Sequence, residues 1–304
     1  MPINSEEVFS TRGVVAMRKV FDAHFHIGHW GQRRLFGREV CPLLPSHDGD
    51  YIPGQEHEDY RDVQRYLTHY DIFGGLVMCN FLGDDPRYSL IDLNKVALEA
   101  AHKCENVYTA LFVSPRGEDW DYTREAMNMA KSDPNVKAIK MTPTHWDAFS
   151  PDPTTWSSEV RNNFEDIFKF AEDKGLVIQF HSGLLNAEPL LFDSFLKEYG
   201  SEGIRLYLVH SGETCYPGMQ YTTLIREWLD KGYQVYSDVS LAPGFVMPKL
   251  LSVLCADEVE HIMFATDAPW GNFASEVAKI EDLSISEDIK QKIFYDNAIK
   301  LFGL

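Results

Sequence analysis

The feature that most constrains this chain is a regular alternation of short apolar runs with longer amphipathic stretches, the patterns of strands and helices respectively. Eight strand-like runs lie at Val20–His26, Gly75–Phe81, Val107–Val113, Val136–Thr142, Leu176–His181, Ile204–His210, Tyr233–Val239 and His261–Asp267. Helix-like stretches between them lie at Tyr60–Tyr70, Ile91–Cys104, Tyr122–Lys131, Asn162–Lys174, Leu190–Tyr199 and Tyr221–Lys231. Strands that alternate with helices pair in parallel, and eight such units in 304 residues fit a closed barrel better than an open sheet. The sequence therefore predicts an α/β fold, a (β/α)8 TIM barrel.

The predicted barrel leaves two irregular segments, an N-terminal extension and a long loop after the first strand. The loop, Ile27–Glu58, is rich in Gly, Pro, His and Arg. A loop of this length in a compact domain is usually functional, although a disordered insertion is the alternative. A chain of 304 residues that is 44% hydrophobic can bury a single large core. We expect one domain over residues 1–304 with these two additions.

Charge and cysteine usage restrict the partners and the compartment. A net charge of −18 repels phosphate backbones and anionic membranes, so we expect neither nucleic-acid nor membrane partners. An anionic small molecule stays open as substrate, because a metal or an Arg can reverse the field inside a pocket. The five cysteines include no C-x-x-C, and neither a signal-peptide core nor a membrane-length apolar run is present. We expect a cytoplasmic protein with free thiols, for which a homo-oligomer such as a dimer stays open.

The strongest local signal is an H-x-H pattern at the end of the first strand-like run. Alternate residues of a strand share a face, so His24 and His26 point one way while Phe21, Ala23 and Phe25 point the other. In a barrel the apolar face packs on the outer helices, which leaves both imidazoles inside, at the C-terminal end where barrel active sites lie. Two converging imidazoles suit a divalent metal such as Zn²⁺, although structural histidines are the alternative for an H-x-H alone.

Three further strand-like runs end in a side chain that can bind a metal. His181 and His210 each end a run and precede Ser-Gly, and Asp267 ends the eighth run before a loop containing Pro. Any one of them could be an ordinary buried histidine or a helix-capping aspartate. Four of the eight runs, however, place such a residue at the rim that carries barrel chemistry. The pattern therefore predicts a metal site.

The same pattern resembles the amidohydrolase superfamily, in which H-x-H lies on the first strand, His on the fifth and sixth, and Asp on the eighth. The closing stretch Ile293–Leu304 resembles the terminal helix of the amidohydrolase-2 branch, which includes aminocarboxymuconate-semialdehyde decarboxylase and related decarboxylases, hydratases and lactone hydrolases. The resemblance covers the chain from Val20. It implies one divalent metal, most readily Zn²⁺ with Mn, Fe or Co as alternatives, held by His24, His26, His181 and Asp267. It also implies that His210 orients substrate or carries a proton, and that Asp267 accepts a proton from water.

Lys140 has two interpretations. It lies near the end of the fourth run on the face opposite Ile139 and Met141, which places it inside the barrel. Binuclear members of the superfamily have a carboxylated Lys at this place that bridges two metals, and His181 and His210 would then bind the second ion. We favour one metal, with Lys140 as a positive charge that binds a substrate carboxylate or polarises a carbonyl.

Weaker candidates for substrate contact share a position in or near the rim loops after the first and fourth runs. They are Trp30, Arg33, Arg34, His57, His145 and Trp146. An Arg at such a place can bind a carboxylate through two hydrogen bonds, although a solvated surface charge is the ordinary alternative.

Taken with the resemblance, the predicted site indicates a metal-dependent hydrolase. Its substrate would be a small, carboxylated ester, lactone or amide cleaved by metal-activated water. One alternative is a non-oxidative decarboxylase or hydratase that acts on an unsaturated or aromatic carboxylic acid at the same site. A second alternative is a barrel that binds ligand without turnover, which has no need of so complete a set of ligand-type residues.

Overall fold

The computed structural model describes residues 18–28, 57–79, 90–143, 149–200 and 203–304. Its centre is an eight-stranded sheet in the order β1 to β8, with every neighbouring pair parallel. The strands are β1 (Phe21–Ile27), β2 (Gly74–Cys79), β3 (Val107–Phe112), β4 (Val136–Met141), β5 (Val177–His181), β6 (Arg205–Val209), β7 (Gln234–Asp238) and β8 (Ile262–Met263). The predicted (β/α)8 barrel is confirmed.

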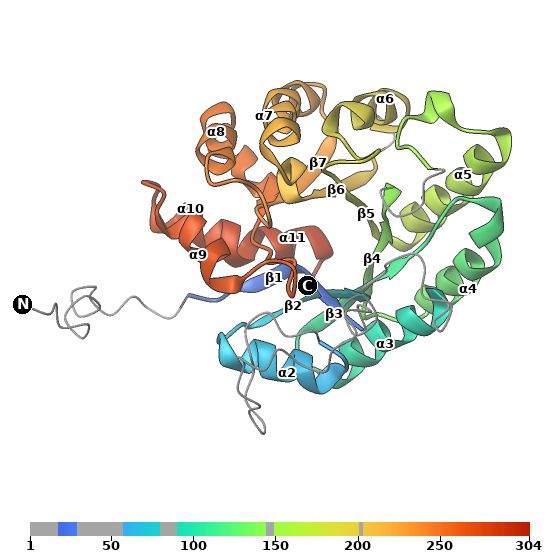
Figure 1. The fold of residues 1–304 in the computed structure, drawn as a ribbon, viewed down its shortest axis with the longest axis horizontal. Coiled ribbons are helices and arrows are strands. Elements are labelled where there is room, and N and C mark those ends of the chain that lie inside the picture. Colours follow the sequence, from blue (N-terminus) through green and yellow to red (C-terminus); the bar gives the residue numbers. More distant parts are fainter. Residues whose placement is uncertain (1–17, 29–56, 80–89, 144–148, 201–202) are drawn as a thin grey trace, which may run out of the picture.

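Helices form a ring around the outside of the strands (Figure 1). They are α2 (Tyr60–His69), α3 (Leu90–Lys103), α4 (Trp120–Ala130), α5 (Ser158–Lys174), α6 (Pro189–Tyr199), α7 (Cys215–Asp230), α8 (Val246–Val253), α9 (Phe273–Glu281), α10 (Glu287–Gln291) and α11 (Asn297–Phe302). Helix α5 ends at Gly175, whose φ of 63° is the left-handed cap that glycine adopts without a steric cost. Among the helices that the structure describes, none is long and apolar enough to span a membrane.

The barrel closes along a seam between β1 and the residues that follow β8. The backbone N–H of Ala23 donates to Phe264 O at 3.1 Å, and that of Asp267 donates to His24 O at 2.8 Å. Strand β8 itself has only two residues, so the predicted run to Asp267 continues the barrel wall beyond the regular strand. The seam therefore fixes the backbone of Asp267 beside that of His24.

Strand β1 is irregular where it carries the H-x-H pattern. Its register against β2 shifts between Asp22 and Phe25, as at a β-bulge. Phe25 faces the outer helices as predicted, because its ring lies 5.5 Å from that of Tyr66 on α2. Bulges frequently lie next to active sites, where they redirect a side chain.

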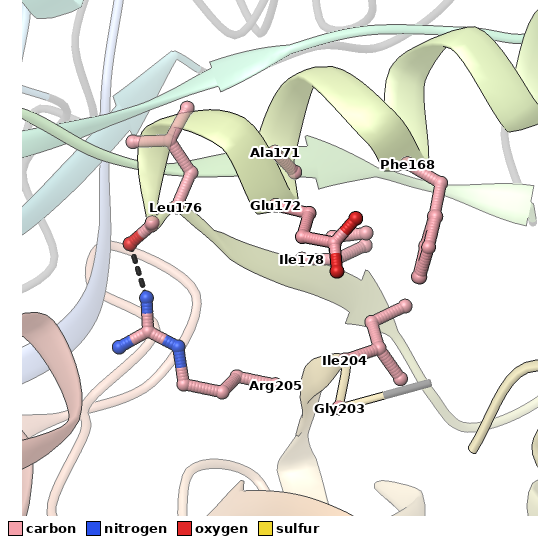
Figure 2. A pocket seen from close by; sticks show the side chains of 9 residues that line it. Phe168, Ala171, Glu172, Leu176, Ile178, Gly203, Ile204 and Arg205 are labelled. Atoms are coloured by element: carbon pink, nitrogen blue, oxygen red, sulfur yellow. Dashed lines mark hydrogen bonds between the residues drawn. The ribbon is translucent and has the colours of Figure 1, made fainter. Parts of the chain in front are cut away.

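The N-terminal end of the barrel is covered by the C-terminal helix. The ring of Phe302 lies 6.3 Å from those of both Phe21 and Tyr207, and Arg205 donates to Leu301 O at 2.8 Å. A pocket of about 100 Å³ lies near this end, between α5 and the starts of β5 and β6 (Figure 2). Because barrel sites form at the opposite ends of the strands, this pocket is separate from the candidate centre described next.

Candidate metal centre

The candidate metal centre lies at the seam, where β1 meets the residues after β8. His26 Nε2 is 3.0 Å and His24 Nε2 is 3.4 Å from Asp267 Oδ1. One ligand atom from each residue lies within 4.8 Å of the others, and all three residues are buried. Within the residues that the structure describes, neither nitrogen of His24 nor Asp267 Oδ1 has a partner with hydrogen-bond geometry. Buried polar atoms that converge in this way suit a cation, and two imidazoles with a carboxylate suit Zn²⁺ or a similar divalent metal.

The protonation of the two β1 imidazoles also suits metal binding. His26 Nδ1 lies 3.1 Å from Cys79 O on β2. A carbonyl can only accept, so Nδ1 carries the proton and the lone pair of Nε2 faces Asp267. Burial, followed by the nearby positive charge of Lys140, holds the pKa of His24 well below its usual range. A neutral imidazole is the form that binds a metal.

The other two predicted histidines lie farther round the same rim. The ring centroid of His210 is 5.0 Å from that of His24 and 5.0 Å from that of His181. His181 Nε2 lies 3.8 Å from Glu213 Oε2, a carboxylate whose pKa burial raises. His181 belongs to neither compact group of ligand atoms found among the described residues, so its role as a ligand stays a prediction.

A second compact group contains a residue that the sequence analysis did not identify. It comprises His24, His210 and Asp238, the last residue of β7. Asp238 is fully buried, and its Oδ2 lies 3.8 Å from His24 Nδ1. Burial raises the pKa of Asp238, and hydrogen bonds from Ser240 and Tyr207 act in the opposite direction by lowering it. The signal for it was present, because Asp238 ends a strand at the same rim as the predicted ligands.

Asp22 lies behind the centre and ties three elements together. Its Oδ1 accepts from the backbone N–H groups of Thr266 at 3.0 Å and His24 at 3.3 Å. Its Oδ2 accepts from Tyr66 Oη at 2.7 Å and from Thr266 Oγ1 at 2.6 Å. Burial raises the pKa of Asp22 to about 7 despite these bonds. The carboxylate thus holds α2 and the residue before Asp267 against β1.

Lys140 is buried next to a second buried polar side chain. In the register of β4 and β5 it pairs with Gln179. Among the described residues, no hydrogen bond reaches Lys140 Nζ, either amide atom of Gln179, or Thr142 Oγ1. Burial lowers the pKa of Lys140 to about 7, while the charges of Asp267 and Asp238 oppose the shift. Leaving such groups unsatisfied costs roughly 1–3 kcal/mol each, which indicates space for a polar ligand group.

Of the weaker candidates, the structure describes only His57. It is buried, its Nδ1 donates to His26 O at 2.7 Å, and its ring lies 4.9 Å from that of Tyr66. It therefore anchors the end of β1, and its contact with substrate stays a prediction. The other candidates lie outside the described residues: Trp30, Arg33, Arg34, His145 and Trp146.

Several rim residues have left-handed backbones although they are not glycine. The φ angles are 55° at Asp267, 72° at His210 and 62° at Glu213. Such conformations cost roughly 1–3 kcal/mol each and cluster at functional sites, where the surrounding structure enforces them. Three ligand-type or acidic side chains at one rim thus depend on an unfavourable backbone.

A (β/α)8 barrel with a His–His–Asp group at its C-terminal rim has the architecture of a metal-dependent barrel enzyme. Residues 21–304 match the family Amidohydro_2, described as amidohydrolase, and the chain belongs to this family. The predicted resemblance is therefore confirmed. The chain is a metal-dependent enzyme, and the barrel without turnover is set aside. No curated protein sequence matches the chain.

Solved structures confirm the fold at low sequence identity. A probable 2-pyrone-4,6-dicarboxylic acid hydrolase from Acinetobacter baumannii, with citric acid bound, has a TM-score of 0.64 at 10% identity, covering 94% of this chain and 100% of its own. A 5-carboxyvanillate decarboxylase from Novosphingobium aromaticivorans, with manganese and a nitrobenzoic acid, has a TM-score of 0.60 at 14% identity, covering 96% and 99%. A dihydroxybenzoic acid decarboxylase from Polaromonas, with manganese and 2-nitroresorcinol, has a TM-score of 0.62 at 14% identity, covering 95% and 98%.

Proposed function

We propose that the protein hydrolyses a small, carboxylated ester, lactone or amide with water activated by one divalent metal. The observation that carries this proposal is the convergence of His24, His26 and Asp267. Among the described residues, His24 Nε2 and Asp267 Oδ1 have no partner with hydrogen-bond geometry. With His181 these residues would hold the ion, and three imidazoles with a carboxylate favour Zn²⁺, with Mn²⁺, Fe²⁺ and Co²⁺ as alternatives. A bound divalent ion supplies Lewis acidity, which lowers the pKa of water toward about 7.

Asp267 and His210 would handle the proton of the attacking water. Asp267 Oδ1 faces both β1 imidazoles, so its carboxylate lies at the reacting centre. His210 lies between His24 and His181 along the rim, and its ring centroid is 5.0 Å from that of each. From there it can orient the substrate or transfer a proton to the leaving group.

Lys140, with Gln179 beside it, would bind the carboxylate of the substrate. Both side chains are buried and lack hydrogen-bond partners in the described part of the chain, and an anion would satisfy the amine and the amide N–H together. The alternative is a carboxylated Lys140 that bridges two ions, with His181 and His210 on the second. Metal stoichiometry distinguishes these two arrangements.

The same site fits a second reaction, the non-oxidative decarboxylation of an aromatic or unsaturated acid. The observation that favours it is a set of exposed apolar side chains on the loops and helix starts after β5 to β8. They are Leu184, Leu185, Leu190, Tyr216, Met219, Phe245 and Trp270. Such a rim would accommodate an aromatic ring, and two solved structures with this fold are named as decarboxylases of aromatic acids.

Two substrate panels separate these reactions. The metal-loaded protein is incubated with carboxylated lactones and esters while acid release is followed at constant pH. It is also incubated with aromatic and unsaturated acids while carbon dioxide is measured. We expect acid release from the first panel, and none from His24→Ala or Asp267→Asn. Carbon dioxide without hydrolysis would favour the decarboxylase, and no turnover in either panel would contradict the proposed hydrolase.

A further inference from the structure

We propose that Asp238 is a positioning residue that acts on two imidazoles of the site: it orients His210 through the hydroxyl of Ser240, and its negative charge acts on His24 across 3.8 Å. The proposal rests on the proposed function and adds to it the residues that set the protonation pattern of the rim. Asp238 lies at the end of β7, fully buried behind both histidines. It would act on the reaction through them and not on the substrate.

The link to His210 has only one consistent direction. Asp238 Oδ1 accepts from the backbone N–H groups of Ser240 at 2.8 Å and His210 at 3.2 Å. These groups can only donate, so Oδ1 carries no proton. Ser240 Oγ lies 2.5 Å from the same oxygen and must therefore donate its single proton to it.

That direction determines the tautomer of His210. Its Nδ1 lies 2.8 Å from Ser240 Oγ, and that hydroxyl already donates its proton to Asp238. The hydroxyl can therefore only accept, and Nδ1 of His210 carries the proton. The lone pair is left on Nε2, which is the atom free to accept or return a proton at the site. Asp238 also holds the left-handed backbone of His210 through the N–H bond described above, so it fixes both the chain and the ring.

The link to His24 is electrostatic. His24 Nδ1 lies 3.8 Å from Asp238 Oδ2, which also accepts from Tyr207 Oη at 2.5 Å. When His24 Nε2 faces Asp267, the proton of the neutral ring is on Nδ1, the nitrogen that lies 3.8 Å from this carboxylate. A carboxylate close to a metal-binding imidazole raises the basicity of the ring.

An alternative is that Asp238 binds a cation directly, because it forms a compact group with His24 and His210. Its hydrogen bonds argue against this. Oδ1 accepts three bonds and Oδ2 accepts that of Tyr207, so the carboxylate is already satisfied. A positioning role and a ligand role make different predictions for metal content.

The experiment uses the Zn²⁺-loaded protein with ¹⁵N-labelled imidazoles and three substitutions. Ser240→Ala removes the linking hydroxyl, Ser240→Thr retains it, and Asp238→Asn alters the carboxylate itself. Ser252→Ala is the matched control, because among the described residues that exposed hydroxyl donates to a carbonyl of its own helix α8 and has no contact with the site. The readouts are the His210 tautomer by ¹⁵N NMR, Zn²⁺ affinity and content, and kcat and KM.

We expect wild type, Ser240→Thr and the control to show the proton of His210 on Nδ1. Ser240→Ala should lose this tautomer signature, and its kcat should fall about 10- to 100-fold while KM and Zn²⁺ content are retained. Asp238→Asn should also weaken Zn²⁺ binding about 10- to 100-fold through His24. An unchanged tautomer in Ser240→Ala, or loss of a second Zn²⁺ ion in Asp238→Asn, would overturn the proposal. If wild type turns over no hydrolase substrate, the proposed function fails, whereas the tautomer and the Zn²⁺ affinity still decide this inference.

Discussion

The hydrogen bond from Tyr66 is one of four that the Asp22 carboxylate accepts, and it can be removed without the other three. Tyr66 is fully buried, and its Oη donates to Asp22 Oδ2 at 2.7 Å. Tyr66→Phe would remove this bond but retain the ring contacts with Phe25 at 5.5 Å and His57 at 4.9 Å. Because the ring stays and no cavity larger than an oxygen forms, the loss above about pH 8, where Asp22 is charged, should equal one hydrogen bond to a charged group, about 1.5–3 kcal/mol.

Urea unfolding of wild type and Tyr66→Phe, with constant m-value, measures this loss. Tyr122→Phe on α4 is the matched control, because Tyr122 is 42% exposed and its change should be within about 0.5 kcal/mol. Thr266 still donates to Asp22 in the variant, so the seam should remain formed and the secondary structure unchanged. A loss below about 0.5 kcal/mol would show that the Asp22 carboxylate does not need the phenol.

Four further predictions concern the metal, the proton, the substrate and the pH. Purified protein should carry about one divalent ion per chain by elemental analysis; a value near two would favour a bridging Lys140, and none after supplementation would contradict the site. His210→Asn should lower kcat about 10²–10⁴-fold with metal retained, whereas loss of metal would identify it as a ligand. Lys140→Met should raise KM about 10-fold or more. It should also raise the free energy of unfolding, because it removes a buried amine that lacks a hydrogen bond among the described residues, and a lower unfolding free energy would refute this. Burial raises the pKa of Glu276 from 4.5 to about 7, so its stabilising contribution is complete below pH 4.5 and is lost as pH rises through about 7. In wild type the free energy of unfolding should therefore fall by up to about 3 kcal/mol between about pH 5 and about pH 8, and Glu276→Gln should abolish this fall. An unchanged dependence of the unfolding free energy on pH in the variant would contradict the prediction.

Sequence periodicity predicted the barrel because each strand and helix carries its own local pattern. It also placed His24, His26 and Asp267 at one rim, since parallel strands end on the same side of the sheet. The structure brings these three within 4.8 Å of one another. Asp238 could have been found by a similar rule, because it is a polar residue one position before the end of the predicted run Tyr233–Val239 and the last residue of β7.

The supporting network could not be predicted in this way. Asp22 bonds to Tyr66, 44 residues away, and to Thr266, 244 residues away. No local pattern links positions so far apart, and the pairing follows only from the closure of the barrel. The tautomer of His210 likewise depends on Ser240, whose hydroxyl lies beyond the end of β7 in a loop. Sequence patterns therefore indicated the candidate ligands but not the groups that surround and support them.

The seam between β1 and the end of the barrel wall also has a consequence for the order of folding. His24 is synthesised early in translation, whereas Asp267, whose backbone N–H donates to the carbonyl of His24, is synthesised late. Contacts of such long sequence separation form late and slowly. A chain emerging from the ribosome therefore cannot assemble the His–His–Asp group until the last strand has been synthesised and docked. Stable metal binding at this group would then occur only after the barrel has closed, and incomplete chains would release the ion.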